Sequence, residues 1–177
     1  MTDKNPGLSR VSALKTAVQW EKEGLKTYLD YALMTNSETG KNMFIQLARD
    51  EHLHMTILEK LIARHETGET QEPIELVESI FQKLRPSLRD IDNYTRGIEE
   101  TNQIHALEMG MKFESRSRDF FRDMADKAED EEERAIFRYL EDMEDAHYHI
   151  LNAQRAGLTD TGTWIEIAPL GMESFIS

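Results

Sequence analysis

The chain has 177 residues, 31% charged and 39% hydrophobic, a composition typical of one globular helical domain. The absence of cysteine excludes disulfides, thiolate catalysis and cysteine-bound iron centres, and it fits a cytoplasmic protein. The net charge of −13 argues against nucleic-acid partners. We find no apolar leader and no run of about 18 apolar residues, so neither a signal peptide nor a membrane span is expected.

Four long segments carry apolar residues at alternating steps of three and four, the spacing of a helix packed along one face. They predict helices over about residues 9–34, 38–64, 102–127 and 130–155. Ser9 is the candidate N-cap of the first helix and Gly157 the candidate C-cap of the last. The short break at residues 35–37 makes the first two helices antiparallel neighbours.

Residues 67–100 form a long connection between the second and third helices. Within it, residues 74–84 predict a short helix that Pro86 ends. A connection of this length can run along the bundle and leave the third helix parallel to the second. We therefore expect a single domain over residues 1–177, an all-α, ferritin-like four-helix bundle with one long crossover. The tail, residues 157–177, is expected to fold back over the bundle or onto a partner subunit.

The second helix has two polar residues on its apolar face. Glu51 and His54 occupy positions in the apolar repeat where leucine or isoleucine would be expected. A buried carboxylate is costly unless it is paired or bound to a metal ion. Because residues three apart share a helix face, Glu51 and His54 can bind the same ion.

The same arrangement recurs 93 residues later, in Glu144 and His147 of the fourth helix. The first and third helices carry an equivalent pair of glutamates, Glu21 and Glu114, on their apolar faces. Glu23 lies off the apolar face and is not a candidate ligand. The chain is therefore interpreted as a duplicated helical hairpin.

Two hairpins of this kind predict a carboxylate-bridged site for two metal ions. The candidate ligands are Glu21, Glu51, His54, Glu114, Glu144 and His147. By their spacing, Glu51 and Glu144 would bridge the ions, while Glu21 and Glu114 would bind one ion each. Four carboxylates balance two divalent ions, and oxygen with imidazole ligands suits iron, with manganese or zinc as substitutes. The alternative is a bundle whose buried-face glutamates are partly hydrated and bind no metal.

Two further residues are candidates for contacts with these ligands. For Tyr28, packing in the core is the default interpretation and a hydroxyl contact with the site is the alternative; its repeat partner is Phe121. Asp50 is a candidate to orient the imidazole of His147, with a hydrated surface position as the alternative. Its repeat partner is Met143, so the symmetry fails there.

These motifs resemble the rubrerythrin di-iron domain of the ferritin-like superfamily. The similarity covers about residues 9–156. It rests on Glu21-x-x-Gly24-x-x-x-Tyr28 with Glu51-x-x-His54, and on Glu114-x-x-Ser117-x-x-x-Phe121 with Glu144-x-x-His147. The resemblance implies two iron ions, a non-haem oxidoreductase that reduces H2O2 or O2 in oxidative stress, and a homodimer.

Two features depart from that family. Rubrerythrins carry a cysteine-ligated rubredoxin domain, which a chain without cysteine cannot form. They also have a further glutamate at the position of Ser117. Electrons would then come from an external donor such as a rubredoxin-type protein or a reductase. The alternatives are a ferroxidase or iron-storage protein, and a metal-stabilised interaction module without turnover.

Overall fold

The computed structural model describes residues 6–68, 73–77, 79, 81–83 and 102–166. Four long helices make up most of it: α1 (Pro6–Met34), α2 (Glu38–Thr67), α4 (Asn102–Lys127) and α5 (Glu131–Thr161). No strand occurs among the described residues. None of the described helices has the apolar length that a membrane crossing requires.

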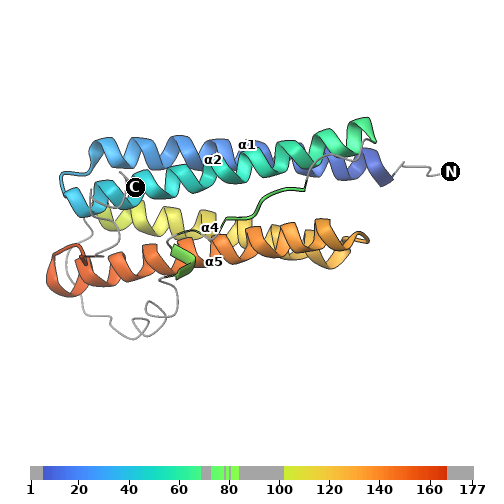
Figure 1. The fold of residues 1–177 in the computed structure, drawn as a ribbon. Helices are drawn as coiled ribbons and strands as arrows, with labels where there is room; N and C mark the ends of the chain where they lie inside the picture. Colours follow the sequence, from blue (N-terminus) through green and yellow to red (C-terminus); the bar gives the residue numbers. More distant parts are fainter. Residues whose placement is uncertain (1–5, 69–72, 78, 80, 84–101, 167–177) are drawn as a thin grey trace.

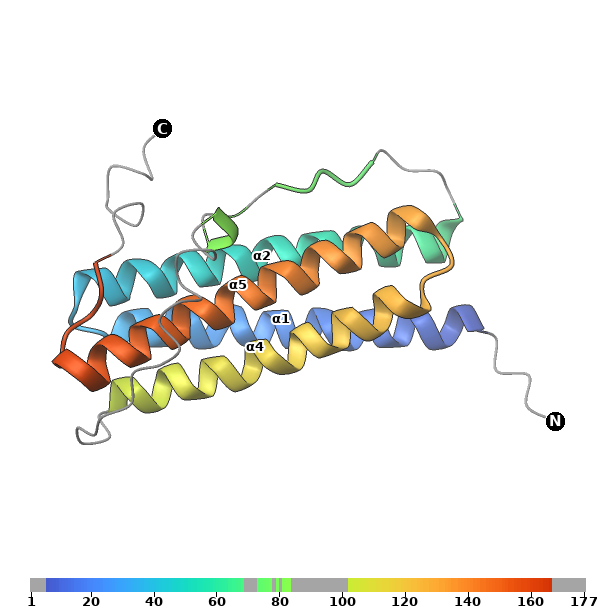
Figure 2. The ribbon, with the colours of Figure 1, turned by 90° about the horizontal axis from the view of Figure 1, so that it is seen from below.

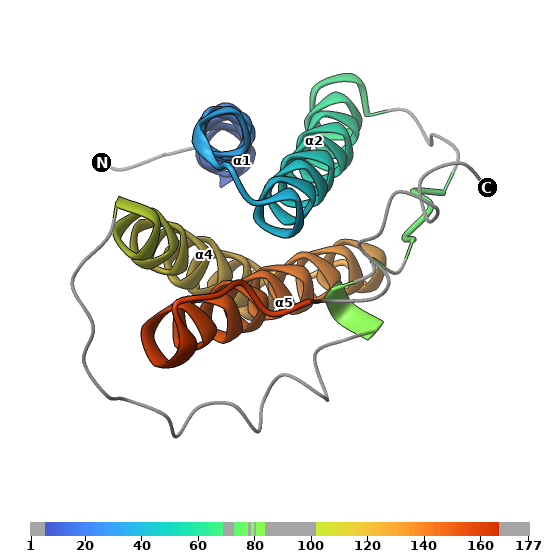
Figure 3. The ribbon, with the colours of Figure 1, turned by 90° about the vertical axis from the view of Figure 1, so that its left-hand side faces the viewer.

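The helices pack as two antiparallel hairpins, α1 with α2 and α4 with α5 (Figure 1). Seen from below, α2 and α4 run in the same direction (Figure 2). The end view places the four helices at the corners of a bundle, with α1 beside α2 and α4 (Figure 3). This all-α arrangement confirms the predicted ferritin-like bundle, since a parallel α2 and α4 require one long crossover between them.

Local sequence signals set both ends of α2 and of α5. The side chains of Ser37 and Asp130 cap α2 and α5 by accepting hydrogen bonds from backbone N–H groups three residues ahead. Gly68 and Gly162 end the same two helices with φ values of 66° and 69°. Glycine adopts this left-handed conformation without the steric cost that a side chain brings.

Two predicted helix ends are wrong. Helix α1 begins at Pro6 instead of at Ser9, because the fixed φ of proline suits the first helical turn. Helix α5 continues past Gly157 to Thr161. The glycine at 157 serves close packing instead, since a Cβ there would lie 2.6 Å from Cγ1 of Ile165.

The predicted short helix over residues 74–84 is wrong in its first part. Residues 73–77 are not helical, and residues 81–83 are the helical part of the described connection. The turn starts late because Ser79 and Gln82 form a reciprocal cap. The Ser79 hydroxyl accepts from the N–H of Phe81 at 3.0 Å, and the Gln82 side-chain oxygen accepts from the N–H of Ser79 at 2.9 Å. Residues 84–101 lie outside the described part of the chain.

The end of the described chain folds back onto the bundle. The side chain of Gln154 holds the backbone of Ile165 with two hydrogen bonds, one to its carbonyl at 2.9 Å and one from its N–H at 2.8 Å. The ring of Trp164 packs edge-on against Phe44, with centroids 5.9 Å apart. The rest of the predicted tail, residues 167–177, lies outside the described part.

One position of the apolar face becomes charged in the second half: Leu25 of the first half corresponds to Arg118 in the second. The structure gives the reason. Arg118 Nη1 lies 3.1 Å from a carboxylate oxygen of Asp145, and its guanidinium lies over the ring of Tyr148 at 5.6 Å from the centroid. The charged side chain therefore packs between α4 and α5 with a partner for its charge.

The apolar core consists of two clusters of buried side chains. One contains Tyr28, Phe44 and Leu47, and the other contains Leu14 and Phe137. Along each helix, the buried polar residues predicted as ligands fall between the segments that supply these clusters. The site is therefore enclosed by apolar side chains at both ends.

Candidate metal centre

The four helices bring all six predicted ligands together. Their side chains come from every helix of the bundle, and each residue is 0% exposed. They are Glu21 of α1, Glu51 and His54 of α2, Glu114 of α4, and Glu144 and His147 of α5. These side chains meet because each one occupies an apolar position of the helical repeat. That position lies on the face of its helix that is directed toward the bundle axis.

The ligand atoms form two overlapping groups. One group is Glu21, Glu51, His54 and Glu144, and the other is Glu51, Glu114, Glu144 and His147. Within each group the donor atoms lie within 4.8 Å of one another. Glu51 and Glu144 belong to both groups. This is the arrangement expected for two ions that share two carboxylates.

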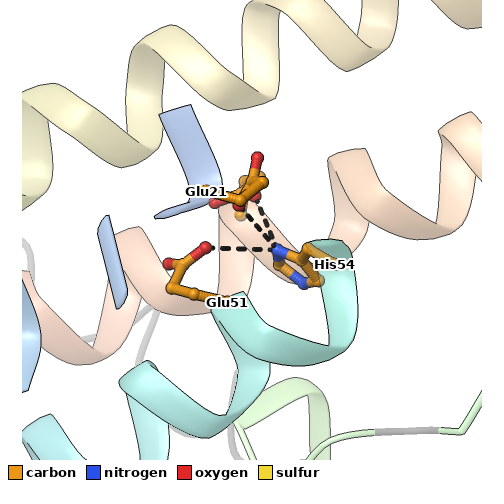
Figure 4. A group of neighbouring side chains, drawn as sticks. Glu21, Glu51 and His54 are labelled. Carbon is orange, nitrogen blue, oxygen red and sulfur yellow. Dashed lines mark hydrogen bonds and ion pairs between the residues drawn. The ribbon is translucent and has the colours of Figure 1, made fainter. Parts of the chain in front are cut away.

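The first group is centred on the imidazole of His54. Its Nδ1 atom lies 3.2 Å from Oε2 of Glu21 and 3.4 Å from Oε2 of Glu51. Figure 4 shows both carboxylates pointing toward the ring. The third carboxylate, that of Glu144, lies 3.1 Å from the same nitrogen. One nitrogen thus faces three carboxylates from three helices.

The second group has the same form around His147. Its Nδ1 atom lies 3.5 Å from Oε2 of Glu114, 3.6 Å from Oε1 of Glu51 and 3.7 Å from Oε2 of Glu144. The two imidazole rings stack with centroids 5.5 Å apart and an interplanar angle of 23°. The two groups therefore lie side by side.

The donor atoms fit a pair of cations. Both carboxylate oxygens of Glu51 and of Glu144, Oε2 of Glu114 and Nδ1 of His147 have no hydrogen bond within the described part of the chain. Buried polar atoms without partners are rare in folded proteins. Two divalent ions would supply those partners and balance four carboxylates, so the buried cluster fits a two-metal site.

The crowding of charge shifts the pKa values of the carboxyl groups. Burial, followed by the charges of Glu114 and Glu144, raises the pKa of Glu51 well above its usual range. Burial and the charge of Glu144 do the same to the pKa of Glu114. Burial acts in the same sense on Glu144, but its contacts with Glu114 and the charge of His54 outweigh burial and lower its pKa. Without a cation, the negative charge is therefore distributed unevenly among the carboxylates of the cluster.

Both histidines hold their protons more tightly than usual in this environment. Burial alone would lower the pKa of His54, but the charge of Glu144 and the contacts with Glu144, Glu21 and Glu51 together outweigh burial and raise that pKa well above the usual range. For His147, burial is likewise outweighed, first by the contact with Asp50 and then by Glu114, so its pKa is raised. When metal is absent, protons on the two histidines therefore supply the positive charge that metal ions would otherwise provide.

The two other candidate residues both contact ligands. The Tyr28 hydroxyl donates a hydrogen bond to Oε1 of Glu114. Burial and the charge of Glu114 raise the pKa of Tyr28 well above 10.0, so the phenol keeps its proton. Asp50 is 5% exposed, and its Oδ2 lies 3.2 Å from Nε2 of His147.

Two neighbours of the site are not among the residues predicted from the sequence. The amide of Gln46 donates to Oδ1 of Asp50 at 2.9 Å, a contact that the spacing of four residues on one helix face could have indicated. Phe81 is fully buried and meets the ring of His147 edge-on, with centroids 5.7 Å apart. No local signal predicts this contact, because it depends on the path of the connection. Glu23 is exposed, as expected for a residue off the apolar face.

The comparison with known families agrees with this geometry. The family model described as Rubrerythrin matches residues 12–154, a span that contains all six clustered residues. No curated protein and no solved structure matches the chain. The family match covers most of the 177 residues, and the buried groups are those of a two-metal site. The chain belongs to the rubrerythrin family and forms a ferritin-like domain of the di-iron type.

Proposed function

We propose that the protein is a non-haem di-iron oxidoreductase that reduces H2O2 or O2 with electrons from an external donor. The observation that carries the proposal is the sharing of Glu51 and Glu144 between two groups of buried donor atoms. Two ferrous ions bound there would supply one electron each, which matches the two electrons that, with two protons, reduce H2O2 to two molecules of water.

The residues of the chain have distinct roles in this proposal. Glu51 and Glu144, which belong to both groups of donor atoms, would bridge the two ions, while the remaining four ligands would divide into one Glu and one His for each ion. Phe81 and the two apolar clusters keep bulk water from the imidazoles. The hydroxyl of Tyr28 keeps its proton and positions Glu114 by donating a hydrogen bond to its carboxylate.

The electron donor is proposed to be a separate protein, such as a rubredoxin-type protein or a reductase. The 177 residues contain no cysteine that could hold a second iron centre next to the buried site. The fully buried ligands also keep a large donor from direct contact with either ion.

Anaerobic titration tests the proposal. Protein loaded with Fe²⁺ should be oxidised by one equivalent of H2O2 per site, followed by its optical spectrum, and a second turnover should require an added donor. Glu51→Ala should abolish the reaction, whereas Glu23→Ala, an exposed residue on α1, should leave it intact. If the loaded protein reacted with neither peroxide nor O2, the oxidoreductase function would be wrong and a structural metal site would replace it.

Molecular mass separates this function from iron storage. We propose a homodimer, which light scattering would detect as twice the chain mass of 20.6 kDa. A shell of many subunits that accumulates iron beyond two ions per chain would show a ferroxidase or storage protein instead.

A further inference from the structure

The two halves of the site differ in the contacts behind their ligands. In the half formed by Glu114 and His147, both terminal ligands have protein partners. Glu114 accepts a hydrogen bond from Tyr28 on Oε1, which leaves Oε2 facing the cluster. Nε2 of His147 lies 3.2 Å from Asp50, which leaves Nδ1 facing the cluster.

The half formed by Glu21 and His54 lacks both contacts. Oε1 of Glu21 and Nε2 of His54 are buried and have no hydrogen bond within the described residues. The repeat explains the difference. The residues equivalent to Tyr28 and Asp50 are Phe121 and Met143, which are both 0% exposed and carry neither hydroxyl nor carboxylate.

These contacts bear directly on metal affinity. A histidine whose outer nitrogen donates to a carboxylate is fixed in one tautomer and one ring orientation, with its other nitrogen free to bind metal. Asp50 is itself held by Gln46, whose amide donates to Oδ1 at 2.9 Å. In the part of the chain that the structure describes, no comparable group fixes the proton of His54 on Nε2. Loss of such outer partners typically lowers metal affinity by about 10–100-fold.

We propose that the two metal positions are unequal, and that the position at Glu114 and His147 fills first and binds more tightly. Tyr28 and Asp50 act as positioning residues for this ion. The bridging residues Glu51 and Glu144 serve both ions and so cannot cause the difference. The inference rests on the proposed two-metal site and goes beyond it, since a symmetric ligand set by itself predicts equal metal affinity at the two positions.

Partial loading with Mn²⁺ tests the order of filling. Metal-free protein would be crystallised with less than one equivalent of Mn²⁺, and anomalous scattering would locate the ion. We expect occupancy at Glu114 and His147 to exceed that at Glu21 and His54 by about tenfold or more. Equal or reversed occupancy would overturn the inference while leaving the two-metal site intact. Absence of bound Mn²⁺ would overturn the two-metal site and the inference together.

Calorimetric titration with Mn²⁺ tests the two positioning residues. Tyr28→Phe combined with Asp50→Met makes this half resemble the other, so the tighter step should weaken by about tenfold or more while the weaker step changes little. Asp50→Asn keeps an acceptor for His147 and should retain most of the preference. Tyr31→Phe, a half-buried tyrosine on the same helix as Tyr28, is the matched control.

A general loss of structure would weaken both binding steps and lower helix content by circular dichroism. Selective loss of the tighter step supports positioning, whereas an unchanged ratio in the double variant would overturn it. The anomalous experiment uses the natural sequence, so it decides the filling order even if the double variant does not fold.

Discussion

Nδ1 of His54 lies 3.1 Å from Oε1 of Glu144, although the two residues belong to opposite halves of the duplicated chain. The reciprocal contact joins Nδ1 of His147 to Oε1 of Glu51 at 3.6 Å. Each group of donor atoms therefore draws on both hairpins. Neither hairpin holds a complete group by itself, so the site is complete only when the two hairpins pack together.

Loss of either bridging carboxylate should weaken the binding of both ions. Glu51→Ala or Glu144→Ala removes a donor from both groups, so each variant should retain fewer than two metal ions per chain after desalting. Metal analysis of the purified variants measures this. Glu23→Ala should keep two ions, since Glu23 is exposed on α1. A Glu23 variant as depleted as the Glu51 variant would show that the helix face of α1 is misassigned.

Loss of either terminal glutamate, Glu21 or Glu114, should weaken the binding of one ion only. Glu21 and Glu114 occur in one group each, so Glu21→Ala and Glu114→Ala should each bind a single ion tightly. Calorimetric titration with Fe²⁺ under anaerobic conditions would show one tight step in place of two. If either variant kept two tight steps, that residue would not be a ligand.

Metal removal should destabilise the protein more as the pH rises. Without metal, the pKa values of Glu51 and Glu114 lie well above the usual 4.5, and those of His54 and His147 lie well above the usual 6.5. A group whose pKa is higher in the folded chain contributes stability fully below its unfolded pKa and loses it as the pH rises through the folded pKa. Metal-free protein should therefore lose stability as the pH rises above about 4.5, first through the two carboxyl groups and then, above about 6.5, also through the two histidines.

Bound metal should remove that loss, because it takes the place of the protons on the ligands. The difference in Tm between loaded and metal-free protein should widen over the same pH range, as measured by calorimetry at several pH values. Glu144 does not oppose this trend, since its lowered pKa affects stability only below the usual value of 4.5. A difference in Tm that narrowed with rising pH would contradict the buried carboxylate cluster.

The folded-back segment should be sensitive to a single methyl group. Gly157→Ala would place a Cβ 2.6 Å from Cγ1 of Ile165 and 3.1 Å from the carbonyl oxygen of Thr163. Overpacking of this kind costs about 1–3 kcal/mol, which a urea titration would measure. Asp160→Ala, a partly exposed position on the same helix, should change stability little. The metal content should stay at two ions, because Gly157 lies away from the ligands; depletion of metal would show that this segment supports the site.

Helix ends show how far local signals reach. Capping by Ser37 and the glycine at 68 follow from a few neighbouring residues, and both occur at the ends of α2. Gly157 carries the same signal as a helix end, yet the structure uses it for contact with Ile165. A glycine permits both uses, and the choice between them depends on which segment packs against it.

The sequence by itself determined the bundle and the set of six clustered residues. Helical periodicity is a local property, so a glutamate or histidine that replaces an apolar residue in the repeat must face the bundle axis. The repeat of 93 residues then pairs each such residue with its equivalent in the other hairpin. Both inferences need only the spacing of residues along one chain.

Only the tertiary structure decided how the two halves of the site differ. Tyr28 reaches Glu114 and Asp50 reaches His147 across gaps between helices, and Phe81 reaches the same histidine from the crossover. Such contacts depend on the rotation and axial offset of neighbouring helices and on the path of the connection. Packing of whole helices sets these quantities, and the periodicity of one helix does not contain them.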